Sequence, residues 1–278
     1  DKGVTPNVAS FVGATTVRVH ELGEKDVDPT PAQLNRMRAL VRQAMKEGAL
    51  GVGSALIYSP ATYAETPELT ALVTEAGKCG GMYISHMRSE GNKLLESIDE
   101  LITISKDSGA PAEIYHFKQA GQPNWGKLDA AIARVNAARA AGQRITANMY
   151  TYTAGATGLD ATMPPWVQSG GLEAWEKRLK DSAVRARLVK EMRSPSNDWE
   201  NLLLLSGGPQ NVLLVSFKNP KLKPLTGKTL AEVAKMRGKS PEETAMDLVV
   251  EDDSRVGTEY FIMSDDNVKR ETALPWMS

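Results

Sequence analysis

The fold of this chain is decided by residues 82–118, which read MYISHMRSEGNKLLESIDELITISKDSGAPAEIYHFK. The short apolar run 82–86 predicts a strand, and the stretch after it carries Leu94, Ile98 and Leu101 at helical spacing. A second apolar run, 111–118, predicts another strand. A strand, a helix and a strand in this order predict two parallel strands joined by a right-handed crossover.

The same unit repeats on both sides of this segment. Strands are predicted at 11–19 and 48–53 before it and at 144–150 after it, with starts about 30 residues apart. Helices are predicted between them, and the first begins at Thr30-Pro31, a capping residue followed by a proline. Five consecutive strand-then-helix repeats predict an α/β protein with a parallel sheet, either a barrel or an open doubly wound sheet.

The composition changes after Tyr152. Residues 153–165 are rich in Gly, Ala, Thr and Pro, and charged helices are predicted at 172–180 and 182–192. A strand is predicted at 211–217, and helices follow that are capped by Thr229 and Ser240. We interpret 1–156 as the repeating part, 157–252 as a largely helical insertion over its mouth, and 253–278 as the return to the repeating part.

Bulk properties exclude several classes of protein. The chain has 278 residues, of which 41% are apolar and 24% charged, with a formal net charge of −1. Lys and Arg are scattered among Asp and Glu, which excludes a nucleic-acid binder, and no apolar run approaches the ~20 residues that span a membrane. One cysteine, Cys79, excludes an intrachain disulfide and leaves a cytoplasmic or periplasmic location open. Nothing indicates the oligomeric state.

Both ends suggest a longer protein. The chain starts at Asp1 without Met, and it stops after Pro275-Trp276-Met277, a run that reads as the start of a buried strand. Chain termini normally lie in loose surface segments. We therefore expect these residues to be an internal piece of a longer chain.

Two of the three histidines occupy equivalent places in successive repeats. His86 ends the strand 82–86 and His116 follows 112–115, one unit later. If the strands are parallel, both imidazoles project from carboxyl ends, where barrel active sites form, and neutral imidazole is a common zinc ligand. The alternative is a hydrogen-bonded polar residue at each strand end. His20 is interpreted as a loop residue.

Four further polar residues follow these strands. Arg88 and Lys118 each lie two residues beyond a histidine, and Tyr150 and Tyr152 end the next strand. A cation and a phenol at this edge are suited to hold a substrate carboxylate. The alternatives are a solvated charge and a packing tyrosine.

At these residues the chain resembles the D-aminoacylases, or N-acyl-D-amino-acid deacylases, of the amidohydrolase superfamily. The resemblance covers nearly the whole chain, and its motifs occur in the family's order: Glu47-Gly48-Ala49-Leu50-Gly51, Ser85-His86-Met87-Arg88-Ser89-Glu90-Gly91, His116-Phe117-Lys118-Gln119-Ala120-Gly121, Tyr150-Thr151-Tyr152-Thr153-Ala154-Gly155 and Met163-Pro164-Pro165-Trp166.

The resemblance implies a (β/α)8 (TIM) barrel, of which this chain holds strands three to seven and the start of strand eight. It implies that His86 and His116 are metal ligands for one or two zinc ions. It also implies that Lys118 and Tyr150, with Tyr152 as the fallback, bind the carboxylate of a small N-acyl amino acid substrate. The implied reaction is amide hydrolysis by a metal-activated water.

The chain also departs from the family's pattern. The family's first-strand His-x-His pair and bridging Cys would precede Asp1, and Cys79 is no substitute for that Cys. The catalytic Asp is expected just beyond Ser278. Asp265 and Asp266 do not replace it, because they read as the cap and first turn of a helix. Two alternatives stay open: a related cyclic-amide or dipeptide amidohydrolase, and a non-catalytic barrel relic.

Overall fold

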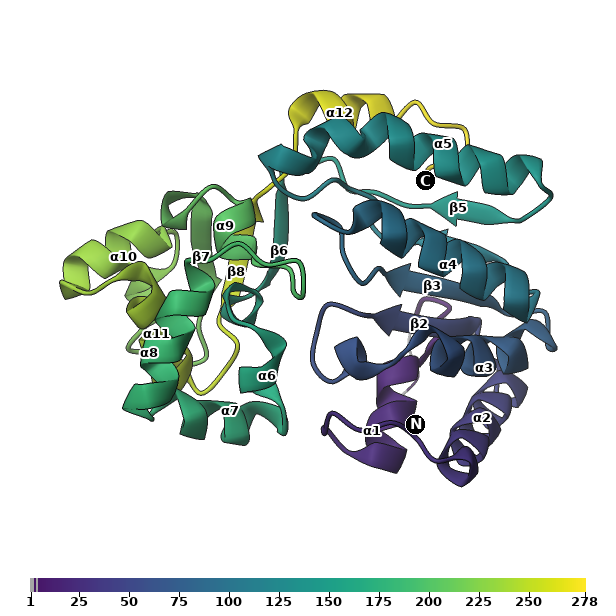
Figure 1. Cartoon of the computed structure of the whole chain (residues 1–278), viewed down its shortest axis with the longest axis horizontal. Helices are drawn as coiled ribbons and strands as arrows, with labels where there is room; N and C mark the ends of the chain where they lie inside the picture. Colours follow the sequence, from purple (N-terminus) through teal and green to yellow (C-terminus); the bar gives the residue numbers. More distant parts are fainter. Residues whose placement is uncertain (1–2, 4) are drawn as a thin grey trace.

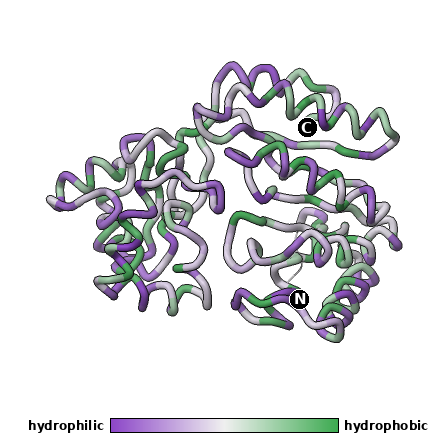
Figure 2. The backbone as a smooth tube through the Cα atoms, in the orientation of Figure 1, coloured by the Kyte–Doolittle hydropathy of each residue, from purple (hydrophilic) through white to green (hydrophobic). Residues whose placement is uncertain are grey.

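A computed structural model describes residue 3 and residues 5–278, which form two units lying side by side (Figure 1). The first unit holds a parallel sheet and the second holds an antiparallel sheet. Each has a hydrophobic core of its own. Apolar residues follow the strands and alternate with polar ones along the surrounding helices (Figure 2).

The first unit confirms the predicted α/β repeat. Its strands are all parallel and stand in sequence order in the sheet: β1 (Val12–Gly13), β2 (Gly51–Ala55), β3 (Met82–His86), β4 (Ala112–Ile114) and β5 (Ile145–Ala147). The helices between them are α1 (Ala14–Leu22), α2 (Pro31–Lys46), α3 (Thr66–Gly77), α4 (Leu94–Ser108) and α5 (Leu128–Ala140), with short 3-10 turns η1 (Ala61–Tyr63) and η2 (Gln122–Lys127). The strand 82–86 is confirmed at both ends.

The last residues of the chain extend this sheet. Met277 forms a parallel bridge with Ala147 of β5, and the Ser278 amide donates a hydrogen bond to the Ala147 carbonyl at 3.0 Å. Trp276 lies buried in the core of the first unit. The interpretation of 275–277 as the start of a strand beside β5 agrees with this pairing.

The predicted strand 11–19 is wrong beyond its first residues. The sheet contains only Val12–Gly13, and Ala14–Leu22 forms helix α1. The β-branched residues of this stretch favour a strand locally, but Ala14, Val17 and Arg18 are buried at helical spacing. Tertiary packing therefore overrides propensity. His20, which was interpreted as a loop residue, lies on the exposed face of α1.

The second unit is built on an antiparallel sheet of three strands in the order β6 (Ala154–Gly158), β8 (Gly257–Phe261) and β7 (Val212–Ser216). Its helices are α6 (Pro165–Gln168), α7 (Gly171–Leu179), α8 (Ser182–Met192), α9 (Leu202–Leu205), α10 (Leu230–Arg237) and α11 (Pro241–Asp252), with turns η3 (Leu159–Thr162), η4 (Pro209–Asn211) and η5 (Lys223–Leu225). The predicted caps Thr229 and Ser240 accept hydrogen bonds from the first turns of α10 and α11.

This unit extends beyond the predicted insertion 157–252 on both sides. Antiparallel pairing begins at Ala154 in β6, and β8 pairs with β6 up to Phe261 and with β7 up to Tyr260. Thr258 and Tyr260 of β8 are fully buried, and pairing on both flanks satisfies the backbone N–H and C=O groups of this central strand. The chain returns to the first unit through helix α12 (Asp265–Glu271), later than residue 253.

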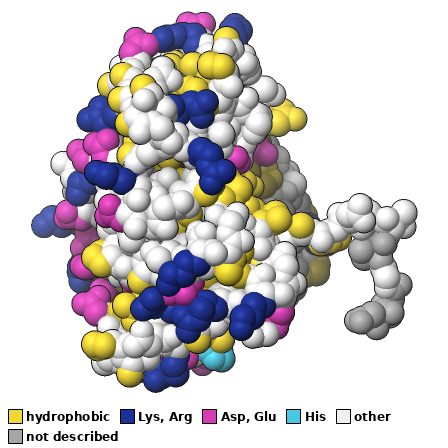
Figure 3. All heavy atoms as spheres, turned by 90° about the vertical axis from the view of Figure 1, so that its right-hand side faces the viewer, with side chains coloured by type: hydrophobic (Ala, Val, Ile, Leu, Met, Phe, Trp, Pro, Cys, Tyr) yellow, Lys and Arg dark blue, Asp and Glu magenta, His cyan; other side chains and the backbone are white. Residues whose placement is uncertain are grey.

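The surface agrees with the charge pattern of the sequence. On the face shown in Figure 3, Lys and Arg side chains lie among Asp and Glu side chains. Within the described residues, no helix has both the length and the apolar character needed to cross a membrane.

Candidate metal centre

The two predicted histidines meet at the carboxyl ends of β3 and β4. His86 is the last residue of β3, and His116 lies two residues past the end of β4. The predicted strand 111–118 is therefore too long. It stops because His116 adopts a positive φ of 44°, where its amide donates to Asn148 Oδ1 at 2.6 Å. This turn brings the imidazole of His116 over the end of the neighbouring strand.

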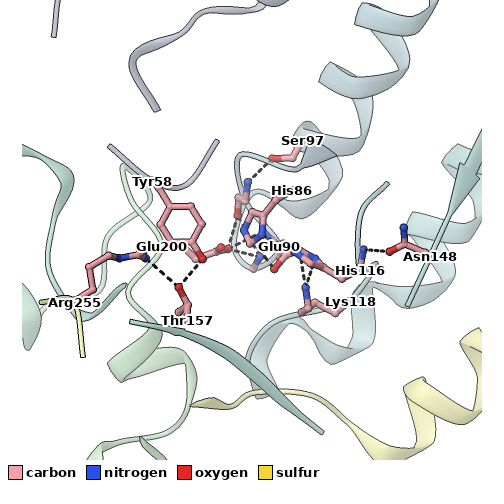
Figure 4. Close-up of polar contacts among 12 residues, drawn as sticks. Tyr58, His86, Glu90, Ser97, His116, Lys118, Asn148, Thr157, Glu200 and Arg255 are labelled. Carbon is pink, nitrogen blue, oxygen red and sulfur yellow. Dashed lines mark hydrogen bonds and ion pairs between the residues drawn. The ribbon is translucent and has the colours of Figure 1, made fainter. Parts of the chain in front are cut away.

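The imidazole rings face each other through one nitrogen each. Nδ1 of His86 and Nε2 of His116 are 2.8 Å apart, and the rings meet edge to face with centroids 4.5 Å apart (Figure 4). Tyr58 and Tyr150 flank the pair, with ring centroids 5.4 Å from His86 and 6.1 Å from His116. One nitrogen of each ring is thus turned toward a shared point.

The outer nitrogens of the two rings face Glu90, which the sequence analysis missed. Its Oε1 lies 2.9 Å from His116 Nδ1, and its Oε2 lies 3.8 Å from His86 Nε2. Lys118 closes the group, with Nζ 2.7 Å from Glu90 Oε1 and 2.6 Å from His116 Nδ1. The available signal was the spacing, because Glu90 stands four residues after His86 inside a motif already singled out.

Burial and mutual charge set the protonation states. Burial lowers the pKa of His86 to about 3, so this ring is neutral at physiological pH. Burial also lowers the pKa of Lys118, although Glu90 opposes this effect. For Glu90, burial would raise the pKa, but His86, Lys118 and His116 together outweigh it and hold the pKa well below its usual range. Glu90 is therefore a carboxylate beside a neutral imidazole, the form of histidine that binds metals.

A cavity of about 590 Å³ opens above these residues. The first unit lines it with the histidines, Glu90, Lys118 and Tyr150, and the second unit contributes Thr157 and Glu200. The Lys118 ammonium lies 5.2 Å from the centre of the Tyr150 ring, and burial raises the pKa of the Tyr150 phenol above its usual range. The cavity therefore offers a cation and a phenol that stays protonated, and its size suits a small molecule.

Two residues predicted to contact substrate lie elsewhere. Arg88 donates to both carboxylate oxygens of Glu100, at 3.0 and 2.9 Å, and to the carbonyls of Thr62 and Ala64. Its donors are engaged with η1 and α4, and Arg88 does not line the cavity that holds the histidines. Tyr152 is 73% exposed and outside the cavity, so of the two tyrosines only Tyr150 lines it.

The other acidic and thiol candidates also lie apart from the histidines. Ser264 is the cap of α12, and Asp265 and Asp266 occupy its first turn, as a helix start requires. Cys79 is exposed. In the part of the chain that the structure describes, His86, Glu90 and His116 are the only group of three potential ligands whose atoms lie within 4.8 Å of one another.

This donor set fits a zinc ion. Zinc is coordinated by imidazole nitrogens, and the other ring N–H of a metal-ligating histidine usually donates a hydrogen bond to a group such as a carboxylate. Here Nδ1 of His86 and Nε2 of His116 are turned toward each other, while Glu90 stands at the opposite nitrogens. Nε2 of His86 is buried without a hydrogen-bond partner in the described residues, which is explained if Glu90 is its electrostatic partner.

Comparisons with known proteins agree with the resemblance seen in the sequence. No family model matches the chain. It is 28% identical over 264 residues to the D-aminoacylase of Alcaligenes xylosoxydans xylosoxydans, a match that covers 95% of this chain and 44% of that protein. It is 30% identical over 151 residues to the N-acyl-D-glutamate deacylase of the same organism, covering 54% of this chain and 31% of that protein. The chain thus spans less than half the length of these relatives.

Solved structures give the same picture. A D-aminoacylase crystal structure, described as defining a subset of amidohydrolases, has a TM-score of 0.74 and 26% identity, covering 98% of this chain and 47% of that one. A D-aminoacylase studied for its binuclear metal centre matches with a TM-score of 0.74 and 25% identity. An N-acyl-D-glutamate deacylase from Bordetella bronchiseptica, complexed with zinc and a phosphonate inhibitor, has a TM-score of 0.75 at 22% identity and supports the fold alone. The resemblance to the D-aminoacylases is confirmed.

Proposed function

We propose that the protein containing this chain hydrolyses the amide bond of N-acyl-D-amino acids with a zinc-activated water. The observation that carries the proposal is the pair of ring nitrogens, His86 Nδ1 and His116 Nε2, facing each other at 2.8 Å on the floor of a cavity. It is joined by the similarity to a D-aminoacylase along 95% of the chain. Two adjacent parallel strands present these nitrogens at the sheet edge where barrel enzymes carry their sites.

The whole protein is proposed to be a (β/α)8 barrel. Five parallel strands in sequence order, with helices between them, are what an arc of such a barrel would contain, here strands three to seven. The parallel bridge of Met277 to β5 supports the start of strand eight. The second unit is then inserted between strands seven and eight, where it closes one side of the cavity.

His86 Nδ1 and His116 Nε2 would hold one zinc ion, and a second ion is proposed from the relative with a binuclear centre. When bound, zinc supplies a water with a pKa of about 7 and polarises the scissile carbonyl. With Nε2 of His116 turned to the metal side, its Nδ1 lies on the opposite side of the ring, 2.9 Å from Glu90 Oε1 and 2.6 Å from Lys118 Nζ. The Asp that moves the proton from water to the leaving nitrogen is expected beyond Ser278.

The substrate carboxylate is assigned to Lys118 and Tyr150. Both line the cavity beside His116, and the Lys118 ammonium has a further N–H besides the one given to Glu90. An ammonium and a protonated phenol match a carboxylate by charge and by donor geometry. A free carboxylate next to the scissile amide is what distinguishes an N-acyl amino acid from a cyclic amide.

The test uses the complete zinc-loaded protein. We expect hydrolysis of N-acetyl-D-amino acids, with little turnover of their L-enantiomers, of a hydantoin or of a dipeptide. His86→Ala should abolish turnover, whereas His20→Ala, which changes an exposed histidine of α1, should leave it unchanged. Undiminished hydrolysis by the His86→Ala variant would overturn the proposal, and preference for the hydantoin would move the protein to a different amidohydrolase activity.

A further inference from the structure

Glu200 connects the second unit to the loop that follows β3. It lies just before α9, and its Oε1 accepts hydrogen bonds from Ser89 Oγ at 2.8 Å and from the amides of Glu90 and Gly91 at 2.8 and 2.5 Å (Figure 4). These groups are more than a hundred residues away in sequence. One carboxylate oxygen therefore gathers three donors from a single tripeptide.

The loop has its own internal bonds that depend on the same tripeptide. Ser89 Oγ accepts from the amides of Gly91 and Lys93 at 3.2 and 3.1 Å, and the Ser89 amide donates to Ser97 Oγ at 2.9 Å. A Cβ on Gly91 would lie 2.8 Å from Glu200 Oε1, so the glycine permits the close approach. The loop is thus built to receive a carboxylate at this position.

The tripeptide carries the side chain that stands behind both histidines. Glu90 places its two oxygens beside His116 Nδ1 and His86 Nε2, the nitrogens turned away from the shared point. A carboxylate in that place fixes ring orientation and tautomer, and its loss typically lowers metal affinity about 10–100-fold. Whatever holds the backbone of Glu90 therefore also governs how the ring nitrogens are presented.

We propose that Glu200 is a positioning residue through which the second unit holds the 89–91 loop and keeps Glu90 behind His86 and His116. The metal side of this inference rests on the proposed zinc site. Glu200 acts through Glu90, because its hydrogen bonds go to Ser89, Glu90 and Gly91 and to neither histidine. The second unit accordingly does more than cover the cavity, since it contributes to the strength of the metal site.

The first measurement is zinc affinity of the complete protein, by competition with a chelator. Glu200→Ala removes the acceptor and should weaken zinc binding about ten-fold or more. Glu200→Gln keeps an acceptor oxygen for the three donors and should recover most of the affinity. Glu242→Ala is the matched control, because it removes a buried carboxylate of α11 that pairs with Arg193 and not with residues 89–91. It should lower the melting temperature and leave zinc affinity unchanged.

The second measurement does not depend on zinc. In the metal-free protein, amide exchange of residues 87–93 should rise about ten-fold in Glu200→Ala and stay at the wild-type rate in Glu242→Ala. Unchanged exchange in Glu200→Ala, or unchanged zinc affinity where the wild type binds zinc, would overturn the inference. A wild type that binds no zinc would remove the proposed function instead, and the exchange result would still decide whether Glu200 holds the loop.

Discussion

At the scale of single residues, two cations with equivalent positions in the sequence have different surroundings in the structure. Arg88 and Lys118 each follow a histidine by two positions, but Arg88 is engaged with Glu100 and two backbone carbonyls, while Lys118 lines the cavity. The difference arises because β4 ends at Ile114 and the chain turns at His116, whereas β3 runs through His86. Local spacing alone does not contain this information.

This separation gives a paired prediction. Lys118→Met should lower kcat/KM for an N-acetyl-D-amino acid about 10–100-fold, because a charge-assisted hydrogen bond to the carboxylate is lost. Arg88→Met should keep kcat/KM within a few-fold and should lower the melting temperature, since Glu100 loses its partner. Steady-state kinetics and thermal unfolding of both variants check the prediction. A larger kinetic loss for Arg88→Met than for Lys118→Met would contradict it.

A second residue-scale feature is the buried ion pair between Arg18 and Glu68. Their side chains are 1% and 6% exposed and lie 2.5 Å apart, and Arg18 also donates to the Val27 carbonyl at 2.6 Å. Burial raises the pKa of Glu68 despite the guanidinium beside it. The pair joins α1 to α3.

Arg18→Met should therefore destabilise the protein by about 3–5 kcal/mol, because it leaves a buried carboxylate unpaired. The double variant Arg18→Met/Glu68→Gln should recover a substantial part of this loss. Urea unfolding of the wild type, both single variants and the double variant measures the coupling. Strictly additive losses would show that the two side chains do not interact.

At the scale of elements, Gly51 decides how closely β2 approaches β3. Its φ is +153°, and a Cβ there would overlap the carbonyl oxygen of Met82, its register partner. Two residues on, a Cβ at Gly53 would meet Ile84 Cγ2 at an ordinary 3.5 Å. A side chain is therefore sterically excluded at Gly51 but can be accommodated at Gly53.

We expect Gly51→Ala to cost more than about 2 kcal/mol, since the backbone of β2 must move to relieve the overlap. Gly53→Ala should change stability by less than about 1 kcal/mol. Chemical denaturation of the two variants compares them directly. Equal midpoints would mean that β2 tolerates displacement at Gly51.

Helix α12 carries a buried acid that makes the element sensitive to pH. Glu271 is 1% exposed, and its Oε1 accepts a hydrogen bond from Gln119 Nε2 at 2.9 Å. Its Oε2 has no hydrogen-bond partner in the described residues, and burial raises the pKa of Glu271 to about 7. The folded state therefore favours the protonated acid more than the unfolded chain does.

The sign of the pH effect follows from that shift. Ionisation of Glu271 costs stability, so its contribution is most favourable below an unfolded-state pKa of about 4.3 and worsens as pH rises toward 7. Glu271→Gln should consequently raise the urea midpoint relative to wild type at a pH of about 8, with a smaller difference at about 5. A difference that is constant across this range would show that Glu271 does not titrate there.

The elements themselves were largely predictable, because most of them form from local pattern. Helices α7, α8, α10 and α11 begin within a residue or two of the predicted starts, and the last three are capped by Asp181, Thr229 and Ser240. The failures, 11–19 and 111–118, are segments with contacts to residues distant in sequence: Arg18 pairs with Glu68, and the His116 amide donates to Asn148.

At the scale of the whole molecule, the sequence predicted only those site residues that occupy equivalent positions in repeated strand-helix units. His86 and His116 were found because two successive units end alike. Glu90 was missed although it stands four residues after His86 in the same unit. Glu200 and the contact of Tyr58 with Thr157 at 2.7 Å were not found, since they depend on how the second unit docks on the first. Docking joins residues about a hundred positions apart, and no spacing rule predicts it.

The two units keep separate hydrophobic cores, and only the first unit contributes the proposed metal ligands. His86, Glu90 and His116 all belong to the first unit, whose core runs from Ala14 to Ala147 and includes Trp276. The second core is built from other residues, among them those of α11. A ligand that binds only folded protein stabilises the part that must be folded to bind it.

Removal of zinc should therefore loosen the two units unequally. In the complete protein, chelation should raise the rate of amide exchange most in β3 and β4, less in the segment that carries Glu200, and least in α11. The reason is that exchange follows the local opening that bound zinc opposes. The effect in β3 should vanish in His86→Ala, which has no zinc to lose. Hydrogen exchange measured peptide by peptide with and without chelator gives all three values in one experiment. An equal rise of amide exchange in α11 would show instead that the two units unfold cooperatively. The contacts of Glu200 and Thr157 would then be strong enough to couple them.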